Sequence, residues 1–275
     1  MKKQNIYMAA IFTAVLFITI MCLVFFPRHR SNKEISRLND YLMEKAVPYT
    51  DMLTLCNIYP HDTEAFTEGL SCYEGMIYES TGRYGHSVLN AHDLKKEKSR
   101  TLAKLPETEF GEGSVIWNDT VFLLTYRENT AYKGELTQDG VFLQSYKYPQ
   151  REGWGLTTDG TTHLIASDGS SNLYIMTDEF RDIRKIPVTL DEIPIWNINE
   201  LEYIDGKIWA NIWHTNIIVI IDPDSGKIEK CLDFSDMIET YITTEVDTLN
   251  GIAFYNGNVF ITGKYYPCIL EFRLK

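Results

Sequence analysis

Ten positions at regular spacing bring together residue types that could transfer protons in a binding hollow. Five of them open a unit that recurs along the chain: Glu68, Glu112, Trp154, Asn199 and Asn250. The other five stand 14 residues later in each unit: Gly82, Tyr126, Asp168, Trp213 and Lys264. Carboxylates and a lysine are rarely buried without partners, and their combination with large aromatic residues is typical of a binding site. A buried carboxyl group there could act as general acid and base, provided that the fold brings these positions together.

Tight turns mark the elements that must position these residues. A turn dipeptide follows each start: Glu74-Gly75, Asn118-Asp119, Asp159-Gly160, Asp205-Gly206 and Asn256-Gly257. Asp-Gly and Asn-Gly between alternating apolar residues are strong hairpin signals, because both central positions of such a turn require positive φ. The sequence therefore predicts five hairpins, of which the third turns one residue earlier than the others.

The interval between units indicates the fold. Successive starts are 44, 42, 45 and 51 residues apart, which is the size of a four-stranded propeller blade. We therefore expect an all-β, five-bladed β-propeller over residues 52–275. In a propeller every blade contributes the same strand to the central channel, so equivalent positions meet in a ring at one mouth. An ordinary β-sandwich with frequent hairpins is the alternative, and the regular period disfavours it.

The N-terminus carries a separate signal. After Lys2 and Lys3, a stretch of 21 residues without charge runs from Ile6 to Phe26, long enough to cross a bilayer as a helix. We expect residues 1–30 to be a membrane anchor or signal segment and residues 31–51 to be a polar spacer. No small-x-small cleavage site follows the apolar stretch, which favours an uncleaved transmembrane helix over a signal peptide. Met21 before Cys22 disfavours a lipoprotein.

Basic residues flank both sides of this stretch, so charge does not decide its orientation. We expect the propeller to be extracytoplasmic, and periplasmic in a Gram-negative cell.

The net charge of −12, with 38 acidic and 26 basic residues, argues against nucleic acid as a partner. The cysteines at positions 56, 72, 231 and 268 form no C-x-x-C pair, so a zinc site is unsupported. They are expected to be buried apolar residues, and a disulfide among them stays open.

Nine strings in order make the sequence resemble one known family. They include Ala65-Phe66-Thr67-Glu68-Gly69-Leu70, Phe110-Gly111-Glu112-Gly113, Gly153-Trp154-Gly155-Leu156, Trp209-Ala210-Asn211-Ile212-Trp213, Leu249-Asn250-Gly251-Ile252 and Thr262-Gly263-Lys264. Over essentially the whole domain, the chain resembles the glutaminyl cyclotransferases of plants and bacteria. The resemblance implies a five-bladed propeller enzyme that converts the N-terminal glutamine of peptides or proteins to pyroglutamate and releases ammonia. It implies no metal and no cofactor.

The resemblance also implies roles for individual residues. Glu112 matches the acidic residue that takes a proton from the substrate amine and then protonates the departing ammonia. Glu68, Asn199 and Lys264 match polar contacts to the substrate, and apolar walls are expected from Phe66, Phe110, Trp154 and Trp213. Tyr126 stands where a tryptophan is usual, so its role in substrate binding is the least defined. From their ring positions we add Asp168 and Asn250 to the substrate-binding set, and from the chemistry we expect Lys264 or Asn199 to stabilise the amide oxygen.

Two other functions fit a propeller with such a mouth. A non-catalytic propeller could bind a peptide or protein there without reaction. A metal-dependent propeller hydrolase would need carboxylates and amides converging on calcium, and the aromatic residues together with Lys264 disfavour a cation. Release of ammonia from a Gln-initiated dipeptide separates the enzyme from the binding module.

Overall fold

The structure, a computed structural model, describes residues 32–275 of the chain. The anchor expected between residues 6 and 26 lies outside this range. Among residues 32–275, no helix combines the length and the apolar character needed to span a bilayer. The compact unit that contains the propeller runs from Leu42 to Lys275, so it begins before the boundary predicted at residue 52.

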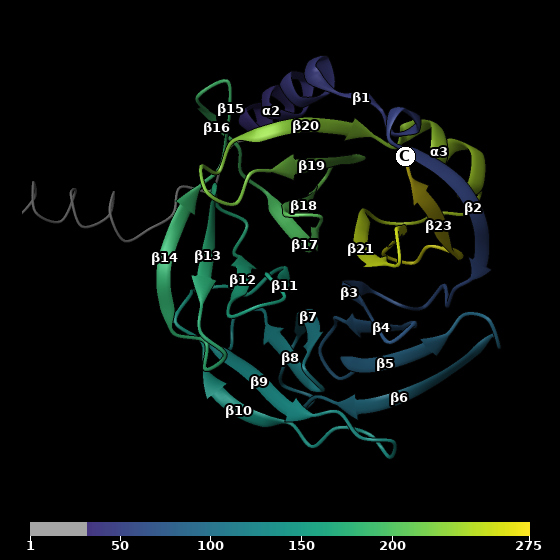
Figure 1. Ribbon diagram of the computed structural model, residues 1–275, viewed down its shortest axis with the longest axis vertical. Coiled ribbons are helices and arrows are strands. Elements are labelled where there is room, and N and C mark those ends of the chain that lie inside the picture. Colours follow the sequence, from purple (N-terminus) through teal and green to yellow (C-terminus); the bar gives the residue numbers. More distant parts are fainter. Residues whose placement is uncertain (1–31) are drawn as a thin grey trace, which may run out of the picture. The chain divides into compact units, whose positions relative to one another are not determined.

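Five antiparallel sheets surround one axis in this unit, which confirms the predicted all-β, five-bladed propeller (Figure 1). In chain order the strands of the blades are β3 (Thr67–Tyr73), β4 (Met76–Thr81), β5 (Val88–Asp93) and β6 (Lys98–Lys104); β7 (Gly111–Trp117), β8 (Thr120–Thr125), β9 (Thr130–Glu135) and β10 (Gln144–Lys147); β11 (Leu156–Thr158), β12 (Leu164–Ser167), β13 (Asn172–Met176) and β14 (Asp182–Pro187); β17 (Ile198–Ile204), β18 (Lys207–Ile212), β19 (Ile217–Ile221) and β20 (Ile228–Asp233); β21 (Leu249–Tyr255), β22 (Asn258–Gly263) and β23 (Cys268–Leu274). Strands β3, β7, β11, β17 and β21 lie nearest the axis (Figure 1).

The remaining elements precede the first repeat or connect blades. They are α2 (Asn32–Lys45), β1 (Val47–Pro48), the 3-10 helix η1 (Tyr49–Asp51), β2 (Leu53–Pro60), the hairpin of β15 (Thr189–Leu190) and β16 (Ile193–Pro194), and α3 (Ser235–Tyr241). Strand β1 adds a fifth, parallel strand to the fourth blade. Part of the expected spacer is therefore built into a sheet.

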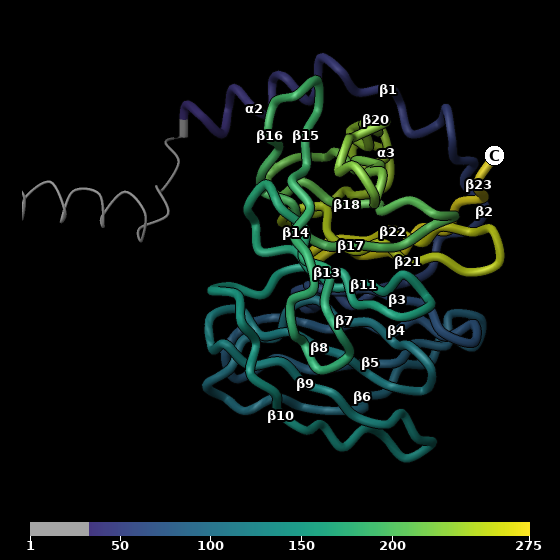
Figure 2. Tube along the Cα trace, turned by 60° about the vertical axis from the view of Figure 1, so that its left-hand side comes forward, coloured from purple at the N-terminus to yellow at the C-terminus, as the bar shows by residue number. Residues whose placement is uncertain are grey.

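The propeller is closed by the pairing of strands from opposite ends of the unit. The fifth repeat supplies only three strands, and β2 completes its sheet by pairing antiparallel with β23, from Leu53↔Leu274 to Pro60↔Cys268. Figure 2 shows β2 and β23 next to each other in a second view. Because this pairing satisfies the backbone groups of β23, it removes an open sheet edge at the end of the chain.

Four of the five predicted turns have the expected conformation, with both central residues at positive φ. In the second unit, for example, Asn118 and Asp119 have φ of 49° and 55°. The third turn is wider than predicted, because β11 ends at Thr158 and β12 begins at Leu164. There the Asp159 carboxylate accepts hydrogen bonds from the backbone N–H groups of three loop residues: Thr161, Thr162 and His163. A carboxylate that satisfies several loop amides stabilises a longer connection than a two-residue turn.

The inner strands approach closely around the axis. A Cβ added to Gly155 would lie 2.1 Å from the carbonyl oxygen of Asn199 in the next blade, so this contact requires glycine. The fourth unit has Glu200 at the equivalent place, and its buried carboxylate accepts hydrogen bonds from the backbone N–H groups of Leu70 (3.2 Å) and Ile252 (2.8 Å). Burial raises the pKa of Glu200 well above its usual value. This one side chain thus joins the inner strands of the first, fourth and fifth blades.

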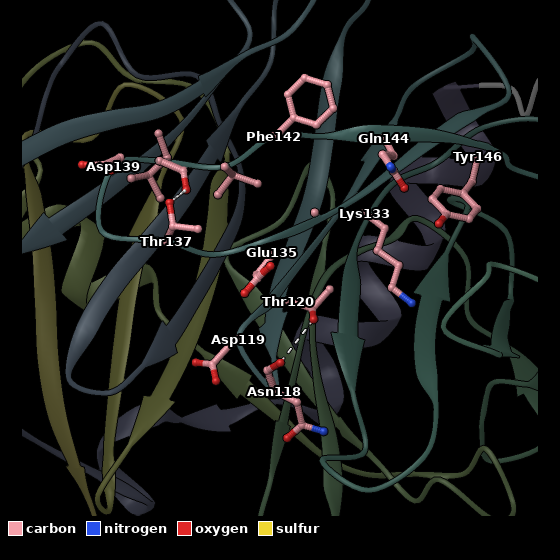
Figure 3. A pocket seen from close by; sticks show the side chains of 14 residues that line it. Asn118, Asp119, Thr120, Lys133, Glu135, Thr137, Asp139, Phe142, Gln144 and Tyr146 are labelled. Atoms are coloured by element: carbon pink, nitrogen blue, oxygen red, sulfur yellow. Dashed lines mark hydrogen bonds between the residues drawn. The ribbon is translucent and has the colours of Figure 1, made fainter.

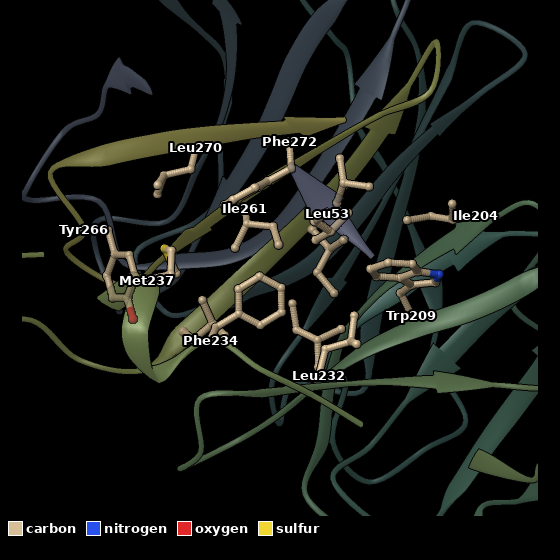
Figure 4. Close-up of a cluster of buried hydrophobic side chains, with 14 of the residues drawn as sticks. Leu53, Ile204, Trp209, Leu232, Phe234, Met237, Ile261, Tyr266, Leu270 and Phe272 are labelled. Carbon is tan, nitrogen blue, oxygen red and sulfur yellow. The ribbon is translucent and has the colours of Figure 1, made fainter. Parts of the chain in front are cut away.

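The fourth and fifth blades share a large apolar cluster that the closing strand and α3 complete (Figure 4). Met237 of α3 and Phe234 just before it are buried with Leu53 of β2 and Phe272 of β23. Burying a side chain of this size stabilises the fold by about 1.5 to 3 kcal/mol. The chain that forms α3 lies between the fourth and fifth units, which explains the longest interval in the repeat.

Candidate active site

A cavity of about 220 Å³ lies where the inner strands begin. It is lined by Phe66, Glu68, Phe110, Glu112, Tyr126, Trp154, Asn199, Trp213, His214, Asp247 and Lys264. Nine of these residues were predicted from the sequence as site residues. Residues more than 190 positions apart in the chain, such as Glu68 and Lys264, meet here.

Irregular strand pairing places the first residue of most units at the cavity. In four blades, the inner strand has one extra residue relative to the neighbouring strand, near the start of their pairing. These inner strands are β3, β7, β17 and β21. In β3 the extra residue is Glu68, between the paired residues Thr67 and Gly69. Such β-bulges turn a side chain out of the regular alternation and are frequent next to active sites. The bulges therefore explain how Glu68, Glu112 and Asn199 reach one cavity.

Glu68 and Lys264 form a buried ion pair. The Lys264 Nζ donates a hydrogen bond of 2.6 Å to the Glu68 Oε1, and the two side chains are only 7% and 3% exposed. The same Nζ lies 4.2 Å from the centre of the Phe66 ring, a distance that allows cation–π attraction. A buried pair of this kind is costly to break, because the remaining charge would be left without a partner.

Glu112 lies beside this ion pair and has a strongly altered proton affinity. Burial raises the pKa of Glu112 well above its usual value, and the negative charge of Glu68 raises it further, while Lys264 opposes the shift. The Glu68 carboxylate forms its ion pair with Lys264 at short distance. Two neighbouring carboxyl groups rarely ionise together. Burial and the neighbouring Glu68 charge therefore favour the protonated form of Glu112, which makes this carboxyl group the candidate for proton transfer.

Aromatic side chains form two walls around these groups. On one side, Phe110 packs edge-on against Phe66 with ring centres 6.1 Å apart and lies 5.8 Å from Tyr126. On the other side, Trp154 and Trp213 meet edge to face with ring centres 5.3 Å apart. Gly82, the second ring position of the first unit, gives Phe110 its place, since an added Cβ would lie 2.3 Å from that ring.

Two predicted residues do not line the cavity. The Asp168 carboxylate accepts hydrogen bonds from the Tyr174 hydroxyl (2.8 Å) and the backbone N–H of Ser170 (3.0 Å). The side-chain amide of Asn250 is fully buried and donates a hydrogen bond to the Thr67 carbonyl (2.9 Å). The placement of both residues supports a structural role, and the predicted contact with substrate is without support from the geometry.

Two lining residues were missed by the sequence analysis. His214 follows Trp213 directly and stacks on it with ring centres 3.7 Å apart. Asp247 lies in the segment between α3 and β21, and both residues are exposed at the rim. His214 could have been predicted from the sequence, because it directly follows Trp213, a predicted site residue. Asp247 occupies no repeat position, so the sequence offered no signal for it.

A larger groove of about 940 Å³ lies elsewhere, around β9 and the loop before β10 (Figure 3). Its acidic side chains, Asp119, Glu135 and Asp139, are all exposed. Lys133 in the same groove is paired with Asp178 at 2.6 Å. These side chains are solvated, whereas Glu112 is buried beside an ion pair and aromatic rings. The smaller cavity is therefore the candidate active site, although the groove is larger.

Within residues 32–275, no group of three or more His, Cys, Asp or Glu side chains is arranged to hold a metal ion.

Comparisons with known proteins point to one family. Residues 30–274 match the family model described as glutamine cyclotransferase. The chain is 35% identical over 230 residues to a glutaminyl-peptide cyclotransferase of Arabidopsis thaliana, covering 79% of this chain and 69% of the relative. The crystal structure of the Myxococcus xanthus glutaminyl cyclase matches with a TM-score of 0.71 and 30% identity, covering 81% of this chain and 96% of the other.

Proposed function

This chain belongs to the glutamine cyclotransferase family, and from that membership we propose that its cavity converts the N-terminal glutamine of peptides and proteins to pyroglutamate. The family makes the chain an acyltransferase. The observation that carries the assignment to this cavity is the buried Glu112 beside the Glu68–Lys264 ion pair and between aromatic walls, where burial raises the pKa of Glu112. Such a site can hold a small substrate end away from water while a proton is moved.

The reaction is intramolecular, so the site has to hold the substrate in a reactive rotamer. The α-amine attacks the side-chain amide carbon, a ring C–N bond forms, and the bond to the amide nitrogen breaks. The amine attacks as the neutral free base. In contrast to the order that the resemblance implies, Glu112 first gives its proton to the leaving nitrogen, which departs as ammonia, and its carboxylate then takes the surplus proton from the ring nitrogen. One carboxyl group is thus acid and base in turn and ends the cycle as it began.

The amide oxygen gains negative charge as the amine attacks. Lys264 is the buried cation of the cavity, and its Nζ already makes one short contact to Glu68. Asn199, which is 3% exposed, offers a side-chain amide from the start of β17. We assign stabilisation of the oxygen to these two residues, because fixed donors inside a water-poor site lower the energy of a developing anion.

The proposed activity is tested by incubating the purified protein with a Gln-initiated peptide. Loss of one ammonia from the peptide mass, matched by free ammonia in solution, is the expected result. A folded protein that binds the peptide but releases no ammonia would instead be a non-catalytic binding module.

Truncation of one aromatic wall should weaken binding more than chemistry. We expect Trp213→Ala to raise KM about tenfold, because a lost aromatic contact costs roughly 1 to 1.5 kcal/mol. The value of kcat should change less, since Glu112 and Lys264 remain in place. Trp213→Phe, which keeps an aromatic ring, should recover most of the loss. Steady-state kinetics with one peptide checks this, and an unchanged KM in the alanine variant would exclude the wall role.

The cellular location is a separate proposal. We propose that residues 6–26 anchor the enzyme in a membrane and that the propeller lies on the extracytoplasmic side, in the periplasm of a Gram-negative cell. The support for the anchor is the length of the uncharged stretch. The full chain should stay with membranes after an alkaline wash, whereas a chain that begins at residue 32 should not. Recovery of the full chain in the soluble fraction would refute the anchor.

A further inference from the structure

Asp247 brings a negative charge to the rim of the cavity, near the imidazole of His214. Its carboxylate accepts a hydrogen bond from the Thr248 hydroxyl at 2.8 Å, and among residues 32–275 it forms no ion pair with a lysine or an arginine. The nearest cation in the lining, Lys264, is already paired with Glu68 at 2.6 Å. Because Lys264 and Glu68 compensate each other, Asp247 leaves a negative charge at the opening of the cavity.

The backbone holds this carboxylate in a defined place. The N–H of Asp247 donates to the Lys264 carbonyl at 3.1 Å, and the N–H of Lys264 donates to the Thr248 carbonyl at 3.0 Å. Asp247 is thus fixed beside a buried residue of the site while remaining exposed itself. A charge held in this way is a better recognition element than one on a free loop.

A flat aromatic surface lies on the same rim. His214 stacks on Trp213 with ring centres 3.7 Å apart and an angle of 30° between the planes, and both line the cavity with Asp247. Burial lowers the pKa of His214, and the charge of Asp247 opposes this shift. A guanidinium or ammonium group can rest on such rings while it pairs with a carboxylate.

Next to Tyr126, another residue of the lining, the nearby arginine is already paired with a carboxylate. The Arg127 guanidinium lies 4.3 Å from the centre of the Tyr126 ring and donates a hydrogen bond of 2.9 Å to Glu152. The charge of Arg127 is therefore compensated by Glu152 and does not offset the charge of Asp247.

The direction of the substrate decides what meets this rim. On the proposed function, the α-amine and side chain of the first residue must reach Glu112, which is 6% exposed. The peptide continues from the carbonyl of that residue and has to leave through the opening. We propose that Asp247, with the stacked His214 and Trp213, binds the second residue of the substrate and selects a lysine or an arginine there.

The test compares kcat/KM for peptides that begin Gln-Arg, Gln-Lys, Gln-Ala and Gln-Glu. At low salt, the wild-type enzyme should favour Gln-Arg over Gln-Glu by about fivefold to tenfold, the effect of one partly exposed ion pair. The preference should shrink as ionic strength rises. Asp247→Asn should bring the ratio close to one, and Asp247→Lys should reverse it. Glu245→Gln removes the same charge from an exposed position in the same segment and should leave the ratio unchanged.

The outcomes separate this inference from the proposed function. If no peptide releases ammonia, the proposed function fails. If Gln-Ala is cyclised and the wild-type enzyme treats Gln-Arg and Gln-Glu alike, only the role of Asp247 is refuted. A preference that persists in Asp247→Asn refutes it as well, because another group would then carry the selection.

Discussion

Replacing Glu112 with glutamine should lower kcat for a Gln-initiated peptide by a factor of about 10² to 10⁴, the usual contribution of a positioned acid–base group. Glutamine keeps the shape of the side chain but can neither give nor take a proton. Because burial raises the pKa of Glu112 and so favours its neutral form, the substitution should change the charge of the cavity little. The loss should therefore fall on the chemical step and leave KM within a fewfold of the wild-type value.

The control for this variant is Glu107→Gln, an exposed residue in the connection between β6 and β7. It should retain full activity, and both variants should melt within a few degrees of the wild type, since neither change opens a cavity. Near wild-type turnover in Glu112→Gln would show that another group transfers the proton. The assignment of Glu112 would then be wrong even though the fold and the cavity stand.

Replacing Glu79 with glutamine should destabilise the fold by about 3 to 5 kcal/mol, the cost of breaking a buried charged network. The Glu79 carboxylate is fully buried and accepts hydrogen bonds from the Nε2 atoms of His61 and His92 at 3.0 Å each and from the Thr67 hydroxyl at 2.6 Å. His61 follows the closing strand β2, and its Nδ1 contacts the Tyr266 carbonyl at 2.8 Å. The network thus ties the closure of the propeller to the strand that carries Glu68.

The effect should depend on pH in a defined direction. Burial alone would raise the pKa of Glu79, but the two histidines outweigh this effect and hold the pKa well below its usual range. A carboxylate with a lowered folded-state pKa contributes stability above its unfolded value, about 4.5, and loses that contribution as the pH falls. Burial lowers the pKa of His61, but the charge of Glu79 outweighs this effect and raises it. The contribution of His61 to stability is therefore complete below about pH 6.5 and declines at higher pH. The difference between wild type and variant should be largest between about pH 4.5 and 6.5.

Urea unfolding at pH 5.5 and at pH 3.5 measures this difference. Glu97→Gln is the matched control, because it removes a carboxylate from an exposed turn of the same blade, and it should change stability by less than about 0.5 kcal/mol. Equal unfolding midpoints for wild type and Glu79→Gln at pH 5.5 would show that the network contributes nothing net to stability.

The repeat could be recognised in the sequence because its turns and strands depend on residues that are close together in the chain. A two-residue turn such as Asp205-Gly206 needs positive φ at adjacent residues, and alternating apolar residues on either side form its strands. Equal spacing of such hairpins predicts blades, and the ring arrangement then predicts which positions share a mouth. This reasoning placed Glu112, Asn199 and Lys264 in one cavity.

The exceptions have physical reasons of the same kind. Asp168 and Asn250 have the right repeat positions, but their side chains are engaged elsewhere. Asp168 accepts a hydrogen bond from Tyr174 in its own blade, and Asn250 donates one to the Thr67 carbonyl of the first blade. A repeat predicts where a residue sits along its strand, and a β-bulge or a competing hydrogen bond decides where its side chain goes.

The amino-acid order alone thus determined the number of blades, most of the turns and the ring of residues around the mouth, since each of these follows from neighbours in the chain or from a fixed period. Tertiary structure alone decided the closure of β2 on β23, the Glu79 network with its two histidines, and the position of Asp247 on the rim. These features join segments that are distant in sequence and fall outside the repeat, so they leave no periodic trace and exist only once the propeller has closed.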